Sequence, residues 1–159
     1  MRRSGPVASI GLAILFLASG GLRSHELRPA QDPVNLLAMT ELKAGAGGHY
    51  IVTASINGND IKVIVDTGAS AVALSYQDAE RAGLRPRNLI FDVPVQTANG
   101  VGMAARVTLR EVEIDTVRVD DVQGMVLQDG ALNGTLLGMS FLGKLRSFQV
   151  ENGRLILKN

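Results

Sequence analysis

From residue 49 to the C-terminus, short runs that alternate apolar and polar residues are separated by turns rich in glycine. Alternation with a period of two is typical of half-buried strands. Four Asn-Gly pairs fall between such runs, and this pair favours the positive φ angles that two-residue hairpin turns require. The pattern predicts three hairpins, formed by residues 50–56 with 61–65, 93–97 with 104–109, and 148–151 with 154–157. The remaining pair, Asn133-Gly134, predicts a loop that leads into a short strand at residues 135–137.

Two further segments complete the predicted elements. Residues 112–126 alternate Val and Ile with charged residues, which predicts a strand pair with one face in solvent. A short helix is expected after Ser75, which can cap it, with Asp78 three residues later and Gly83 as a stop. A second, shorter helix is expected after Gly138. The sequence thus predicts a mainly β fold with one or two short helices.

The N-terminus has the pattern of an export signal. Arg2 and Arg3 precede an apolar run at residues 7–22. This run is shorter than the roughly 20 residues usual for a spanning helix, so a cleaved signal peptide and a membrane anchor both stay open for residues 1–23. A buried N-terminal helix is the third interpretation, but paired arginines before an apolar run favour export. We expect export to the periplasm, either free or tethered to the inner membrane through residues 7–22.

The segment after this run reads as a linker. Residues 24–48 contain prolines and glycines around a weak apolar cluster. A local helix or an edge strand at residues 36–42 stays open. Residues 49–159 are expected to form one domain with one modest core, because the chain is about one domain long.

Composition and charge exclude several classes of chemistry. The chain has no Cys, which removes thiol catalysis, thiolate zinc sites and disulfides. Its 16 basic and 15 acidic residues leave no broad basic surface, so nucleic acid is not expected as a partner. His25 and His49 lie far apart, and no closely spaced oxygen ligands surround a glycine as in a calcium loop. We expect neither a metal nor a cofactor.

Candidate chemistry begins with Asp66. The apolar run 63–65 leads directly into Asp66-Thr67-Gly68, so a carboxylate stands where a strand enters a turn of small residues. An Asp in that place can simply form the turn, because its side chain bonds readily to the following backbone amides. A second motif, Leu136-Leu137-Gly138, about seventy residues downstream, shifts the interpretation towards catalysis.

Together the two motifs resemble those of the aspartic proteases of retroviral and pepsin type. The resemblance spans roughly residues 50–157 and is strongest to exported or membrane-tethered bacterial retropepsin-like members with a single catalytic motif. It implies a closed, β-barrel-like acid-protease lobe. It also implies a flap hairpin at residues 96–102, whose tip contains Ala98, Asn99 and Gly100.

The resemblance also implies how the site works. Because the chain has one Asp-Thr-Gly motif, a homodimer must pair two copies of Asp66. Two adjacent carboxyl groups share one proton, so that one can activate water while the other donates to the substrate. In the family the Gly68 amide helps to hold the aspartate, and the Thr67 hydroxyl reaches across the dimer axis.

The implied activity is endopeptidase cleavage of an extended polypeptide. The residues expected to bind the substrate, in the flap and the pocket, are Ala69, Ala98, Asn99, Gly100, Leu137 and Gly138. Met139 departs from the family pattern, because an Arg or Asp that braces the dimer usually follows the second motif.

Two other functions compete with this interpretation. A catalytically inactive module of the same fold would use its groove only to hold peptides. A phosphate-transfer fold of the nucleotide-binding ATPase type would need two large lobes, which 159 residues cannot supply.

Overall fold

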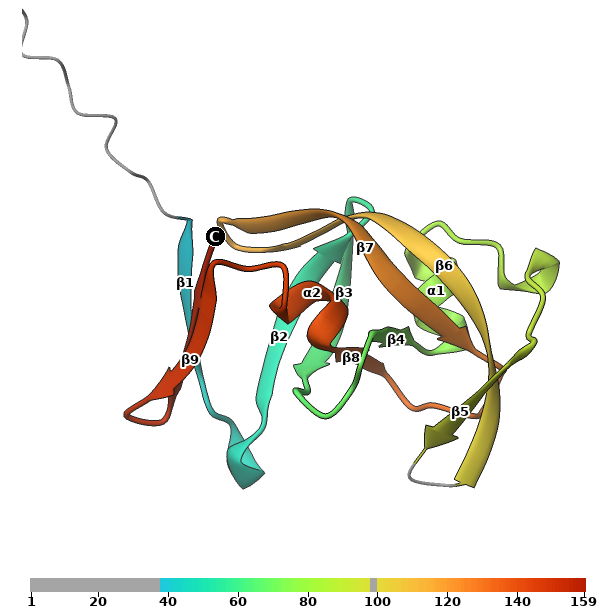
Figure 1. Cartoon of the computed structure of the whole chain (residues 1–159), viewed down its shortest axis with the longest axis horizontal. Helices are drawn as coiled ribbons and strands as arrows, with labels where there is room; N and C mark the ends of the chain where they lie inside the picture. The colour runs from blue at the N-terminus through green and yellow to red at the C-terminus, as the bar shows by residue number, and fades with distance from the viewer. Residues whose placement is uncertain (1–37, 98–99) are drawn as a thin grey trace, which may run out of the picture. The chain divides into compact units, whose positions relative to one another are not determined.

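The computed structural model describes residues 38–97 and 100–159 (Figure 1). The predicted signal peptide or anchor at residues 1–23 lies outside this part of the chain. Within the described part, no helix is both long enough and apolar enough to cross a membrane. The elements in chain order are β1 (Met39–Lys43), the 3-10 turn η1 (Ala46–Gly48), β2 (Tyr50–Ile56), β3 (Asn59–Val65), β4 (Val72–Leu74), α1 (Tyr76–Arg81), η2 (Pro86–Asn88), β5 (Val93–Thr97), β6 (Gly100–Ile114), β7 (Val117–Leu127), β8 (Thr135–Leu137), α2 (Met139–Leu142), β9 (Ser147–Glu151) and β10 (Arg154–Lys158).

Seven of these strands form one sheet in the order β2-β3-β8-β4-β7-β6-β5. An additional pairing between β2 and β6 joins the sheet into a ring, with β5 attached to β6 outside it. The predicted mainly β fold with two short helices is confirmed, and its closed part takes the form of this ring of strands. Parallel pairing occurs between β3 and β8 and between β4 and β7.

Two predicted hairpins are confirmed as β2–β3 and β9–β10. Strands β5 and β6 also form a hairpin, but residues 93–97 pair with residues 100–104, whereas the predicted partner residues 104–109 pair with β7. Asn57 and Gly58 have φ angles of 54° and 85°, which explains why Asn-Gly is favoured at this turn. The long β6–β7 pair, foreseen as a half-buried strand pair, turns at Asp115, whose φ is 51°.

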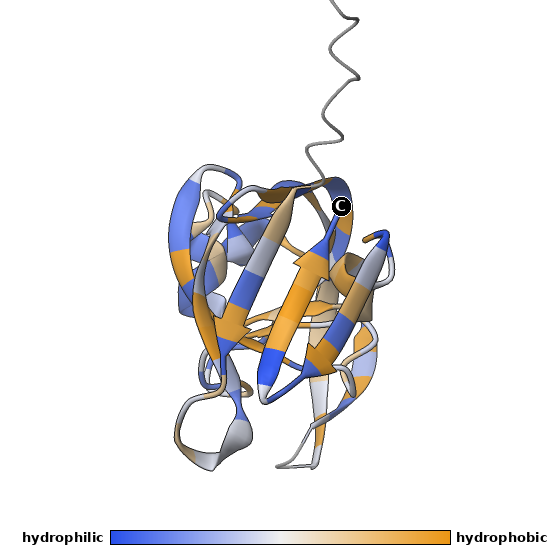
Figure 2. Ribbon diagram, turned by 90° about the vertical axis from the view of Figure 1, so that its left-hand side faces the viewer, coloured by the Kyte–Doolittle hydropathy of each residue, from blue (hydrophilic) through white to orange (hydrophobic). Residues whose placement is uncertain are grey.

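A second sheet contains β1, β10 and β9 in that order. Figure 2 looks onto this sheet, and its central strand β10 is apolar along its middle. The predicted boundary between linker and domain, at residue 48, is therefore corrected. β1 belongs to the folded body and is the edge strand that the sequence left open for residues 36–42. Leu42 is only 8% exposed, and the Thr40 hydroxyl donates to Asp115 Oδ2 (2.7 Å).

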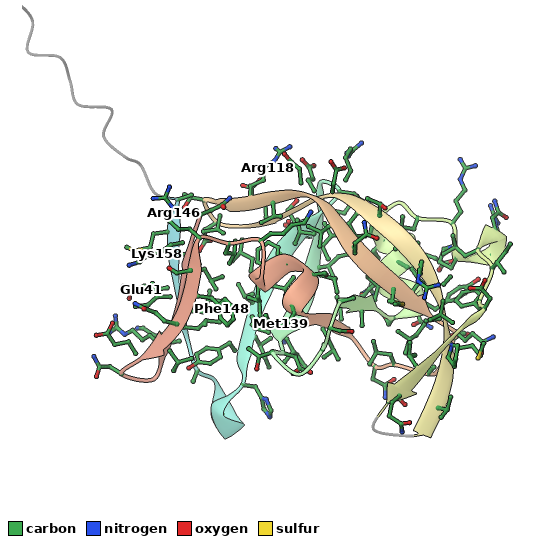
Figure 3. The ribbon with its side chains drawn as sticks, viewed as in Figure 1. Glu41, Arg118, Met139, Arg146, Phe148 and Lys158 are labelled. Atoms are coloured by element: carbon green, nitrogen blue, oxygen red, sulfur yellow. The ribbon has the colours of Figure 1, made fainter. Side chains whose placement is uncertain are left out.

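The core lies between the ring of strands, the three-stranded sheet and α2. Its apolar side chains come from nearly every strand, and Phe141 and Leu142 of α2 are fully buried within it. Met139 and Phe148, which are labelled in Figure 3, pack against this core and are partly buried. Glu41 and Arg146 are exposed and project outwards.

Helix α1 is capped as predicted, but its acidic residue has another role. The Ser75 hydroxyl accepts a hydrogen bond from the Asp78 amide (3.2 Å). The Asp78 carboxylate accepts bonds from Arg81 (2.9 Å) and from the Thr135 hydroxyl (2.8 Å). Because Asp78 and Thr135 are both buried, this bond ties α1 to β8 and so fixes the strand that carries the second motif.

Candidate active site

Asp66 stands at the end of β3, where the two sequence motifs meet. Strands β3 and β8 run parallel, with Val65 opposite Leu137, so both motifs emerge at the same edge of the sheet. The Asp66 amide donates to the Leu137 carbonyl oxygen (3.1 Å). The Gly68 amide donates to Asp66 Oδ1 (2.8 Å), and this bond orients the half-buried carboxylate.

Gly138 allows the two motifs to pass each other at close range. A Cβ atom at this position would lie 2.3 Å from the Ala71 carbonyl oxygen and 2.5 Å from that of Ala69. Next to it, the Met139 amide donates to the Ala69 carbonyl oxygen (2.8 Å). Gly138 thus lets the two backbone segments pack closely, and it does not line the cleft described below.

Ser140 is a positioning residue that sequence reasoning missed. Its hydroxyl accepts a hydrogen bond from the Val72 amide (2.9 Å) and donates to the Gln123 carbonyl oxygen (2.6 Å). The side chain therefore links α2 to β4 and β7, the strands beside the Asp66 loop. A lone serine two residues after a motif carries no signal from which this link could be predicted.

A cleft of about 740 Å³ opens beside Asp66. Strand β5 forms one wall, and the residues after Asp66 together with β4, β7 and β8 form the rest. Among the described residues that line it, Asp66 carries the one charged side chain, and its neighbours are mostly apolar, with Ser70, Gln96 and Thr97 as polar exceptions. The lining residues are Asp66, Gly68, Ala69, Ser70, Ala71, Ala73, Val93, Pro94, Val95, Gln96, Thr97, Met125, Leu127, Leu132 and Leu136.

The predicted substrate-binding residues do not all lie in the cleft. Ala69 lines the cleft. Leu137 does not: it is fully buried in the core, and its neighbour Leu136 lines the cleft instead, because successive residues of a strand face opposite sides. This alternation was the signal that could have separated the two leucines.

The predicted flap is described in part. Residues 98 and 99, which include Ala98 and Asn99, lie outside the described residues. Gly100 begins β6 with a φ of 107°, and its carbonyl oxygen accepts a bond from the Thr97 hydroxyl (2.8 Å). Gly100 is not part of the cleft lining, whereas Gln96 and Thr97 of β5 are.

A second depression, the β9 hollow, borders Asp66 on another side. It measures about 340 Å³ and is lined by Gly48, His49, Tyr50, Val65, Asp66, Thr67, Phe148, Gln149, Val150 and Leu155. Thr67 is exposed, and within the described part of the chain its hydroxyl has no hydrogen-bond partner. Val150, on the edge strand β9, is 64% exposed. Within residues 38–97 and 100–159, neither the cleft nor the β9 hollow has a second carboxylate among its lining residues.

The fold and this site define a lobe of the retropepsin-like aspartic protease class. A family model described as "gag-polyprotein putative aspartyl protease" matches residues 52–144. The chain belongs to this family.

Solved structures share the fold. A retropepsin-like aspartic protease from Rickettsia conorii is 34% identical, with a TM-score of 0.69 over 77% of this chain and 91% of that chain. The protease of EIAV, solved with the inhibitor HBY-793, is 17% identical with a TM-score of 0.52, over 65% of this chain and 93% of that one. At that identity the second match shows the fold alone.

Two curated relatives are uncharacterized proteins. One, from the region 5′ of cobV in Sinorhizobium sp., is 46% identical over 112 residues, which are 70% of this chain and 48% of the relative. The other, from Rickettsia prowazekii (strain Madrid E), is 38% identical over 110 residues, which are 69% of this chain and 47% of the relative. The chain thus spans about half the length of these relatives.

Proposed function

We propose that this protein is an aspartic endopeptidase that works as a homodimer, with one Asp66 carboxylate from each copy. The observation that carries the proposal is the single carboxylate, held by the Gly68 amide at 2.8 Å, in a cleft whose other lining residues are uncharged. Family membership and the 34% identity to a retropepsin-like protease support it.

A pair of Asp66 carboxyl groups could cleave a peptide bond without further groups. The ionised carboxylate takes a proton from a water molecule, whose oxygen attacks the carbonyl carbon. The protonated carboxyl group gives its proton to the carbonyl oxygen, which forms a tetrahedral intermediate with two hydroxyl groups. The C–N bond then breaks as the nitrogen takes the proton that the first carboxylate gained from water, and one hydroxyl group of the intermediate returns a proton to the second carboxylate. Two carboxyl groups at close range favour this state because they cannot both ionise cheaply.

We propose that the second copy of the chain covers the β9 hollow. It contains Asp66 and the unpartnered hydroxyl of Thr67, and β9 is an edge of the three-stranded sheet. An exposed edge offers unpaired backbone groups to another chain. A two-fold axis on this face would bring the same residues of both copies together, as an isologous interface requires.

Replacing Val150 with Glu should weaken pairing without unfolding the chain. Val150 is 64% exposed, so the folded monomer loses little, whereas two buried charges would face each other across the axis. We expect the dimer dissociation constant to rise about tenfold or more, which corresponds to about 1.4 kcal/mol. The rise in the dimer dissociation constant is measured by sedimentation. It is also measured by the way peptide cleavage per chain depends on protein concentration.

Ile90→Glu is the matched control for this experiment. Ile90 is 79% exposed and lines neither the cleft nor the β9 hollow. Its replacement should leave the concentration dependence unchanged. Equal effects of the two substitutions, or full activity per chain in a monomer, would argue against this interface.

We further propose that the substrate is an extended polypeptide bound as an added strand between β5 and the floor of the cleft. Export of the protein to the periplasm remains a proposal as well. Its support is the pattern of Arg2, Arg3 and the apolar run at residues 7–22.

A further inference from the structure

A separate pocket, the Lys62 pocket, lies next to the cleft and shares Leu132 with it. It measures about 510 Å³, and Asp66 is not among its lining residues. Its lining includes Ile51, Lys62, Ile64, Asp78, Arg81 and Leu132. The pocket thus combines apolar side chains with charged ones, and the catalysis proposed above does not use it.

An apolar strip leads from the cleft into this pocket. Leu136 of β8, which lines the cleft, pairs with Ile64 of β3, and Ile64 pairs in turn with Ile51 of β2. Residues paired across neighbouring strands lie on the same face of a sheet. Ile64 and Ile51 both line the Lys62 pocket, and Ile51 is 45% exposed. A polypeptide that leaves the cleft along this face therefore passes over apolar surface into the pocket.

The charges of the pocket do not cancel. The Asp78 carboxylate accepts from Arg81 Nη1 at Oδ1 (2.9 Å) and from the Thr135 hydroxyl at Oδ2 (2.8 Å), so its charge is balanced by Arg81. Lys62 is exposed. Asp60 lies two residues earlier on the same face of β3, yet within the part of the chain that the structure describes Lys62 forms no ion pair with it or with any other carboxylate.

Hydrogen-bond donors also remain for a ligand. Arg81 binds Asp78 through Nη1, and a guanidinium has further N–H groups on Nε and Nη2. Its side chain is 70% exposed, so these groups are accessible. Together with the three donors of the Lys62 ammonium, they suit a carboxylate, which only accepts hydrogen bonds when ionised.

We infer that the Lys62 pocket is an exosite, a binding site outside the cleft, for an acidic side chain that the substrate polypeptide carries beyond the residues held in the cleft. Lys62 and Arg81 bind the carboxylate of this Glu or Asp, and an apolar residue next to it packs on Ile51 and Ile64. The inference rests on the proposed function, because its ligand is the substrate chain. In a two-fold dimer each copy supplies one such exosite, so an acidic segment on either side of the scissile bond has a partner.

An acidic segment at the right distance from the scissile bond should lower KM. Three sets of peptides carry Glu-Glu, Gln-Gln or Lys-Lys at increasing distances from the same cleavage site. At the distance that reaches the exosite, we expect KM for the Glu-Glu peptide about fivefold below that for the Gln-Gln peptide. The kcat values should agree, because a contact far from the reacting bond strengthens ground state and transition state equally. The difference in KM should shrink as the salt concentration rises.

Lys62→Glu should reverse this charge preference. The pocket then holds two carboxylates and one guanidinium, so KM should be lowest for the Lys-Lys peptide and highest for the Glu-Glu peptide. Lys62→Gln, a smaller change, should give an intermediate result. Lys43→Glu is the matched control, because Lys43 is equally an exposed strand residue and lies outside the Lys62 pocket and the cleft. It changes the net charge by the same amount and should leave the preference for Glu-Glu peptides intact.

A binding measurement separates failure of this inference from failure of the proposed activity. The same peptides are titrated against Asp66→Asn protein and against the double variant Asp66→Asn, Lys62→Glu. If wild-type protein cleaves nothing but the affinities show the charge preference and its reversal, the exosite stands and the protease proposal fails. If the three peptide sets bind equally at every distance, or if Lys62→Glu and Lys43→Glu shift KM alike, the inference is overturned.

A separate partner in this pocket would also overturn the inference. A short Glu-Glu peptide without a cleavage site is added to the cleavage assay, and its binding to wild-type and Lys62→Glu protein is measured. If it occupies the exosite, it should raise KM for the Glu-Glu substrates and leave KM for the Gln-Gln substrates unchanged. Binding that depends on Lys62 but leaves both KM values unchanged would show that the pocket does not hold the substrate chain.

Discussion

Replacing Asp66 with Asn is expected to lower kcat by about 10³-fold or more while the fold and the affinity for peptides remain nearly unchanged. Asn has the same shape, and its side-chain oxygen can still accept the hydrogen bond from the Gly68 amide. It cannot take a proton from water or donate one as a carboxyl group does, so the proton transfers that lower the barrier are lost. Peptide cleavage measures kcat, thermal unfolding measures the stability of the fold, and peptide titration measures the affinity.

Asp60→Asn is the matched control, since Asp60 is an exposed residue of the same strand and its change should leave turnover intact. The experiment also distinguishes an enzyme from a binding module of the same fold. An enzyme loses turnover and keeps affinity. If neither wild-type protein nor the variant cleaves peptides, yet both bind them equally, the protein holds peptides without hydrolysing them.

Gly138→Ala is expected to cost about 3 kcal/mol of unfolding free energy, at the upper end of the range for overpacked sites. The added Cβ would lie 2.3 Å and 2.5 Å from two carbonyl oxygens, those of Ala71 and Ala69. These are backbone atoms and cannot turn aside, so the Asp66 loop or the start of α2 must move. Urea unfolding measures the loss, and cleavage assays should show activity falling with it because the loop carries the catalytic carboxylate.

Gly45→Ala provides the comparison for that substitution. Its Cβ would have an ordinary contact of 3.5 Å to the His49 carbonyl oxygen, and we expect a change within about 0.5 kcal/mol. Equal unfolding midpoints for Gly138→Ala and Gly45→Ala would contradict the close backbone packing between the two motifs.

The parts of the fold that depend on neighbouring residues could be predicted from the sequence. Asn57-Gly58 and Asn152-Gly153 each set a hairpin, because their positive φ angles are a local requirement of the turn. The capped start of α1 at Ser75 follows from similarly local chemistry. The hydrogen bond between the Asp66 carboxylate and the Gly68 amide is equally local, but the catalytic interpretation of Asp66 needed the distant second motif, Leu136-Leu137-Gly138.

The parts that depend on distant pairing could not be predicted. β1 lies in the folded body because it pairs with β10, more than a hundred residues later, whereas the prolines before it and the glycines after it indicated a linker. Leu137 and Gly138, which the motif suggested for substrate binding, do not line the cleft, because the orientation of β8 places Leu136 there instead.

Mixing wild-type protein with the Asp66→Asn variant tests the pairing of the two carboxylates most directly. Wild-type protein is equilibrated with a nine-fold excess of Asp66→Asn protein until subunits have exchanged, and peptide cleavage per wild-type chain is measured. If two Asp66 residues make one site, activity should fall to about one tenth, because only about a tenth of wild-type chains then have a wild-type partner. Unchanged activity per wild-type chain would show that one copy of Asp66 suffices, and would contradict the account.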